Sequence, residues 1–187
     1  MVVVSLLRGV NVGAHHRIRM EPLRSVYESV GLTDVRTLLQ SGNVLFRTRS
    51  RDLGRLARQL EQAFETEFGF RSANLLRTVP ELRAVADANP FAGRPGIAPA
   101  NLAVTFLADA ADDAARTRLE ALKGCPEELH CGTRELYVYY TVGMARPVLT
   151  AAMLDKALLK MPTTTRNWNT VLKLVDLAIE MDKDVVR

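Results

Sequence analysis

Short apolar runs of strand length recur along the first half of the chain. Residues 2–7 are apolar on both alternating faces, which is typical of a central strand that is covered on both sides. Residues 35–39 and 44–48 predict two further strands, and the turn Ser41-Gly42-Asn43 between them predicts a hairpin. Residues 72–77 predict the strand that closes this half.

Two amphipathic segments lie between these strands. One apolar stripe with helical spacing runs from Met20 to Val30, and a second runs from Leu53 to Phe68, each followed by a glycine. The order βαββαβ is the split βαβ, or ferredoxin-like, arrangement, in which two crossover helices cover one face of an antiparallel sheet. There the third strand lies between the first and the second, so we expect Arg8 and Asn43 to be near neighbours at one sheet edge.

The end of the first half predicts a third helix and then a linker. Thr78-Val79-Pro80-Glu81 has the spacing of a capping box. Residues 90–100 contain three Pro and two Gly without hydrophobic periodicity, which indicates a connection. We therefore expect an N-terminal half over residues 1–89 and a C-terminal half over residues 101–187.

The C-terminal half repeats most of the same order. Strands are predicted over residues 102–107, 128–131 and 135–140, and helices over residues 111–123 and from Thr150 onward. A last helix, with Trp168 and Val171 in its apolar stripe, takes the place of a closing strand. The predicted fold class is α+β, with two ferredoxin-like halves, βαββαβ and βαββα, packed together.

Composition excludes a disordered chain and a membrane span. The chain has 187 residues, of which 48% are hydrophobic and 25% charged, and its net charge is +4. Two Cys are too few for a disulfide framework, and the first apolar run is too short for a secretory signal. We expect a cytoplasmic protein without a metal or cofactor. Residues 1–95 hold 14 Arg against 9 acidic residues, so any field that attracts phosphates belongs to the first half.

Three polar clusters interrupt the hydrophobic pattern. Residues 8–13 (Arg-Gly-Val-Asn-Val-Gly) lead into a basic loop at residues 15–19, and residues 40–43 (Gln-Ser-Gly-Asn) form the hairpin turn. Residues 163–170 precede the last helix, which Thr165, Asn167 or Asn169 can cap. The predicted site is a polar groove for an anionic ligand, lined by Arg8, Asn11, Ser41, Asn43, Arg166, Asn167 and Asn169.

Several interpretations of these clusters remain open. A nucleotide or nucleic-acid end is the first choice of ligand, because Arg and Asn side chains bind phosphates and base edges. A small enzyme acting on a phosphorylated substrate is one alternative, although no catalytic motif occurs and only Ser41 offers a nucleophile in the groove. A homodimeric scaffold without a ligand is another, with Gly and Asn serving turn geometry and Trp168 serving the core.

Other polar residues favour structural roles. His130 and Cys131 are adjacent on a predicted strand, so they point to opposite faces and cannot share a metal. Five arginines at residues 47, 49, 51, 55 and 58 form a basic strip, which we interpret as a solvated face partnered by Glu61 and Glu65. Contact between this strip and a nucleic-acid backbone is the alternative.

Four motifs together resemble one bacterial family. They are Leu6-Leu7-Arg8-Gly9-Val10-Asn11-Val12-Gly13, Gln40-Ser41-Gly42-Asn43-Val44, Arg134-Glu135-Leu136-Tyr137 and Thr164-Thr165-Arg166-Asn167-Trp168-Asn169-Thr170-Val171. In this order they are similar to the bacterial domain-of-unknown-function family sixteen-ninety-seven, over essentially the whole chain. The resemblance implies a small cytosolic α+β protein of ferredoxin-like halves, and it implies no particular activity.

Overall fold

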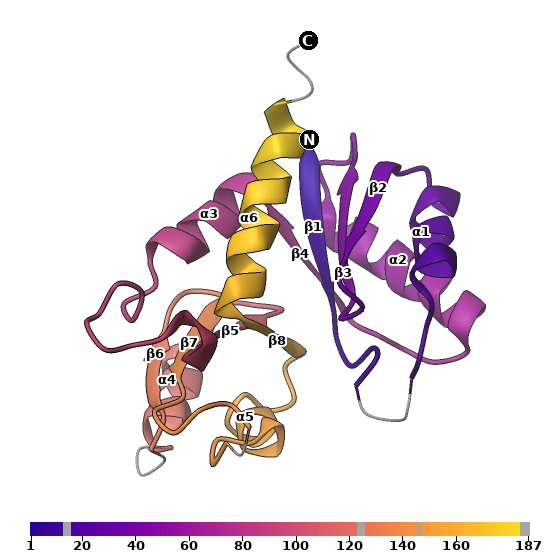
Figure 1. Ribbon diagram of the computed structural model, residues 1–187. Coiled ribbons are helices and arrows are strands. Elements are labelled where there is room, and N and C mark those ends of the chain that lie inside the picture. The colour runs from indigo at the N-terminus through magenta and orange to yellow at the C-terminus, as the bar shows by residue number, and fades with distance from the viewer. Residues whose placement is uncertain (13–15, 123–125, 146, 184–187) are drawn as a thin grey trace. The chain divides into compact units, whose positions relative to one another are not determined.

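The computed structural model describes residues 1–12, 16–122, 126–145 and 147–183 (Figure 1). The chain forms two compact units. The first comprises Met1–Arg83 together with Leu174–Arg187, and the second comprises Ala84–Lys173. The segment that the sequence marks as a linker, residues 90–100, lies inside the second unit.

The first unit contains a four-stranded antiparallel sheet in the order β2-β3-β1-β4. Its strands are β1 (Val2–Leu7), β2 (Thr33–Leu38), β3 (Asn43–Arg47) and β4 (Asn74–Thr78). The third strand lies between the first and the second, as the ferredoxin-like order requires. The prediction for this half is confirmed, with strand bounds that shift by at most two residues.

Two crossover helices, α1 (Met20–Ser29) and α2 (Leu53–Phe68), cover one face of this sheet (Figure 1). Their apolar stripes meet the inward side chains of the strands in one core that includes Val3, Leu23, Phe46, Leu60 and Phe64. Asp52 caps α2 by accepting a hydrogen bond from the Arg55 N–H, and Gly69 ends it in the left-handed conformation at φ 74°.

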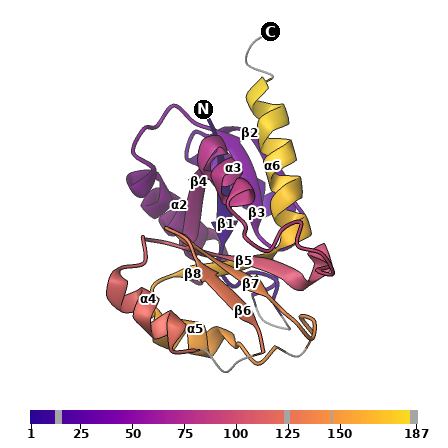
Figure 2. The ribbon, with the colours of Figure 1, turned by 90° about the vertical axis from the view of Figure 1, so that its left-hand side faces the viewer.

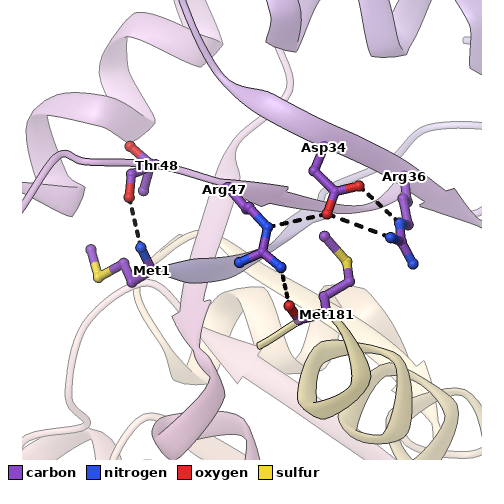
Figure 3. A network of polar contacts seen from close by, with 6 residues as sticks. All are labelled: Met1, Asp34, Arg36, Arg47, Thr48 and Met181. Carbon is purple, nitrogen blue, oxygen red and sulfur yellow. Dashed lines mark hydrogen bonds and ion pairs between the residues drawn. The ribbon is translucent and has the colours of Figure 1, made fainter. Parts of the chain in front are cut away.

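The opposite face of the same sheet is also buried, which explains why β1 is apolar on both faces apart from Ser5. Arg47 pairs with Val2 in the β3–β1 register and donates a hydrogen bond to the Met181 carbonyl of α6 (Trp168–Lys183) (Figure 3). Leu174, Ala178 and Met181 on that helix are fully buried. Residues 174–183 of α6 therefore lie over this face within the first unit (Figure 1).

The second unit contains a second four-stranded antiparallel sheet, in the order β6-β7-β5-β8. Its strands are β5 (Leu102–Leu107), β6 (Glu128–Cys131), β7 (Glu135–Tyr139) and β8 (Thr163–Asn167). The helices α4 (Asp113–Glu120) and α5 (Ala151–Ala157) pack on one face, where Ala115, Leu119 and Leu154 join the core (Figure 2). Before β5 the chain forms the helix α3 (Val79–Asp87), which begins in the first unit and ends in the second, and a 3₁₀ turn at Pro99–Asn101.

The prediction that a helix replaces the closing strand of this half is wrong. Strand β8 is that closing strand, and it pairs antiparallel with β5. Its sequence Thr-Thr-Thr-Arg-Asn lacks an apolar run, but β-branched Thr suits a strand. The Thr165 hydroxyl hydrogen-bonds that of Thr105 on β5 at 2.8 Å, so the polar side chains are paired across the two strands.

The two halves are structural repeats of the order βαββαβ followed by a helix. Arg77 of β4 pairs with Val4 of β1, and Arg166 of β8 pairs with Val104 of β5, so the two arginines hold equivalent positions. Both are buried. The capping box of α3 is confirmed, because the Glu81 carboxylate accepts hydrogen bonds from the Thr78 N–H and hydroxyl. No helix within the described part of the chain is long and apolar enough to cross a membrane.

Candidate anion-binding site

The end of β1 and the β2–β3 turn meet at one edge of the first sheet, as predicted. The Leu7 N–H donates a hydrogen bond to the Gly42 carbonyl at 2.8 Å. Gly42 has φ +71°, and a Cβ there would collide with Val10 Cγ2 and lie 2.9 Å from Leu7 Cβ. Only glycine suits both the conformation and the close approach.

Asn11 connects the two polar clusters through its side chain. Its Nδ2 donates to the Gln40 carbonyl at 2.6 Å and to the Ile18 carbonyl at 3.2 Å, while its Oδ1 accepts from the Ile18 N–H at 2.8 Å. Its backbone is left-handed at φ 54°, which Asn tolerates better than most residues. The carboxamide is thereby used to hold the β1–α1 loop against the hairpin turn.

The hairpin turn is held in the same way. Asn43 is fully buried, and its Nδ2 donates to the Leu38 carbonyl and to Ser41 Oγ, both at 2.9 Å. The half-buried Arg8 continues from β1, and its carbonyl accepts a hydrogen bond from the Ser72 hydroxyl at 2.8 Å. Asn11, Ser41 and Asn43 therefore shape this edge of the sheet.

A cavity of about 460 Å³ opens beside this scaffold. It is lined by Asn11, Arg17, Ile18, Arg19 and Gln40, so that no described lining residue is acidic. Arg17, Arg19 and Gln40 are exposed. Arg19 is also the residue before the first turn of α1, and no side chain caps that turn. The positive end of the helix dipole therefore lies next to the two guanidinium groups, and Glu21 in the first turn offsets part of this charge.

Arg17 and Arg19 are not among the predicted site residues, although the basic loop that contains them adjoins the first polar cluster. Asn11 fixes Ile18 by two hydrogen bonds, which sets the backbone between the two arginines. The His16 ring stacks on Phe70 with centroids 4.1 Å apart and an interplanar angle of 12°. Gly13 and His15, the other named residues of this loop, lie outside the described residues.

The remaining predicted site residues, Arg166, Asn167 and Asn169, belong to the second unit. Arg166 is 7% exposed, and its guanidinium donates to Thr164 Oγ1 at 2.7 Å and to the Thr165 carbonyl at 2.9 Å. Burial lowers the pKa of Arg166 to about 10, because it removes water from the charged form.

Asn167 is the residue that caps the last helix. Its Oδ1 accepts from the Asn169 N–H at 3.0 Å, and its Nδ2 donates to the Ala100 carbonyl at 3.0 Å. Trp168 is buried, which places it in the core rather than on a stacking surface. In the part of the chain that the structure describes, no three His, Cys, Asp or Glu side chains converge to hold a metal ion.

The structure also revises the partners of the basic strip. Glu65 accepts a hydrogen bond from Arg71 at 3.0 Å, and Glu61 accepts one from the Asn74 N–H at 3.0 Å. Neither bond involves an arginine of the strip. Arg47, the first residue of the strip, is bound to Asp34 at 3.2 Å.

Fold and site together define an α+β protein of two ferredoxin-like repeats with a basic cavity at one sheet edge. A family described as "Protein of unknown function (DUF1697)" matches residues 1–137, and the chain belongs to this family. The solved structure of the conserved bacterial protein SP0830 from Streptococcus pneumoniae is similar, with a TM-score of 0.71 and 22% identity over 95% of this chain and 98% of that one. This similarity confirms the fold. No curated protein matches the chain.

Proposed function

We propose that the protein binds a phosphorylated ligand, a nucleotide in particular, in the cavity between the β1–α1 loop and the β2–β3 turn. The observation that carries the proposal is the lining of the cavity: two exposed arginines and no acidic residue among those described. The Asn11 hydrogen bonds fix the described part of the loop against the hairpin turn before any ligand binds. Such preorganisation lowers the entropy cost of binding.

Phosphate is the anion that this lining suits best. Guanidinium groups bind phosphate oxygens through paired, charge-assisted hydrogen bonds, each worth roughly 1.5–3 kcal/mol. The N-terminus of α1 adds its dipole at Arg19. The excess of Arg over acidic residues in the first half of the chain strengthens the same field.

Gln40 favours a nucleotide over inorganic phosphate. Its side chain is exposed at the cavity, while its carbonyl is bound by Asn11. A carboxamide offers both donors and an acceptor, which is the combination that pairs with a base edge. In this arrangement the arginines bind the phosphates and Gln40 contacts the base or sugar.

Isothermal titration with ATP and with inorganic pyrophosphate tests the proposal. We expect Arg17→Ala/Arg19→Ala to weaken binding of both ligands at least tenfold, and Gln40→Ala to weaken ATP binding but not pyrophosphate binding. Arg51→Ala/Arg55→Ala is the matched control, because it removes the same charge from exposed residues of the same unit. Equal loss in the two double variants, or full affinity in the first, would contradict a localised site.

A further inference from the structure

A second cavity, of about 520 Å³, lies in the second unit beside β6 and α4. Leucine side chains, among them Leu119 and Leu129, supply its apolar wall, and three glutamates and one arginine supply its charge. This balance of charge is the reverse of that in the first cavity. It therefore suits a cation with an apolar body rather than an anion.

Glu127 is the polar group that defines this cavity. Its side chain is 7% exposed, and its Oε1 accepts from the Val148 N–H at 2.7 Å and from the Leu149 N–H at 3.2 Å. Its Oε2 is buried and accepts no hydrogen bond from any described residue. Glu127 lines the cavity, and native proteins pair nearly all buried polar atoms, so the unpaired carboxylate oxygen of this residue points to a bound donor.

The other charged residues at the wall already have partners or face solvent. The Arg116 guanidinium donates to the Cys131 and Gly132 carbonyls at 3.2 and 2.7 Å. Glu128 forms an ion pair with Arg94 at 2.8 Å. Glu120 is exposed at the rim. The Arg116 guanidinium is thus bound by two backbone carbonyls, and no hydrogen bond from it to the Glu127 carboxylate is found among the described residues.

We propose that this cavity binds a small aliphatic amine, with its ammonium group on Glu127 Oε2 and its carbon chain along the leucine wall. A single free oxygen suits the point charge of an ammonium better than the planar fork of a guanidinium, which seeks two oxygens. A diamine places its second charge toward Glu120 at the rim. Among the described residues, no three His, Cys, Asp or Glu side chains converge near Glu127 to hold a metal ion.

Titration of the full chain with 1,5-diaminopentane, followed by calorimetry and by NMR at pH 8, tests this inference. We expect saturable binding, weakened at least tenfold by Glu127→Gln, because the amide presents a donor to the ammonium while Oε1 keeps both backbone bonds. Asp109→Asn is the matched control and retains binding, because it removes one carboxylate from an exposed residue of the same unit that does not line the cavity. Pentane-1,5-diol, which has the same chain without charge, does not bind.

Two results would overturn the inference: equal affinity of the diamine for the Glu127→Gln protein, or equal affinity of the parent for the diol. If Glu127→Gln does not fold, Leu129→Trp replaces it, because it adds bulk to a residue of the cavity wall. Unchanged diamine binding in that protein also overturns the inference. Failure here leaves the phosphate site of the first unit untouched, because the two sites take ligands of opposite charge.

Discussion

At the scale of single residues, the core of the first unit contains three hydrogen-bonded polar side chains that the hydrophobic pattern does not predict. The Tyr27 hydroxyl donates to Asn74 Oδ1 at 2.7 Å, and the Ser5 hydroxyl donates to the same oxygen at 2.9 Å. The three residues come from α1, β4 and β1, so one acceptor joins three elements. Burial raises the pKa of Tyr27 because the phenolate would lie in the core without water.

This raised pKa predicts a loss of stability at alkaline pH. Above the ordinary tyrosine pKa near 10, the unfolded chain releases the Tyr27 proton, whereas the folded chain keeps it. The free energy of unfolding therefore falls by about 1.4 kcal/mol per pH unit. Tyr27→Phe removes this contribution. Denaturant unfolding from pH 8 to 11 measures the difference in the free energy of unfolding between the parent and Tyr27→Phe. We expect this difference to be constant below pH 10 and to shrink above it. A constant difference across the range would refute the assignment.

Only some features of the candidate site could be predicted from the sequence. The chain order alone indicated that residue 8 and the turn at residues 41–43 meet, because strand pairing in a split βαβ fixes that edge. It could not show that the Asn11 and Asn43 amides are used by backbone groups, since those partners depend on loop conformation. The sequence shows that Arg17 and Arg19 are charged, but it does not predict where they lie. Their backbone is positioned by the hydrogen bonds between Asn11 and Ile18.

At the scale of elements, apolar strands were predictable and polar strands were not. The strand predicted over residues 102–107 is β5 with the same bounds, because both of its faces are apolar. Strand β8 was missed, because Thr163–Asn167 carries no hydrophobic alternation and its stability comes from pairing with β5. Local propensity for a strand becomes decisive only when a partner strand is present.

The C-terminal helix depends on a polar anchor at its far end. Arg47 donates to the Asp34 carboxylate at 3.2 Å and to the carbonyl of Met181, linking β2, β3 and α6 (Figure 3). We expect Arg47→Ala to destabilise the protein by about 1–3 kcal/mol, because the buried carbonyl and the carboxylate lose a charged donor. Hydrogen exchange should speed up at residues 178–183 in Arg47→Ala. Arg49→Ala, an exposed neighbour, is the control; equal exchange in the two variants would contradict the anchor.

At the scale of the whole molecule, the two repeats are not two independent segments of chain. The first unit takes its last part from the C-terminus, since Leu174–Arg187 belongs with Met1–Arg83. Without that part, the face of the sheet that carries Val2, Val4 and Leu6 has lost a cover. A boundary drawn between residues 89 and 101 alone would therefore separate the first sheet from side chains that it needs.

Removing residues 174–187 should expose this face and destabilise the first unit. Full burial of a Leu or Met side chain contributes roughly 1.5–3 kcal/mol to the free energy of unfolding. Leu174 and Met181 are both fully buried, so we expect a loss of several kcal/mol. Such a loss is comparable to the total stability of many domains. We expect the shortened chain to bind a hydrophobic dye and to melt at lower temperature. Leu174→Asp in the full chain should reproduce the effect in part, whereas Leu172→Asp, at an exposed position of the same helix, should not. An unchanged melting temperature after truncation would mean that the strands and the crossover helices hold the first unit together without α6.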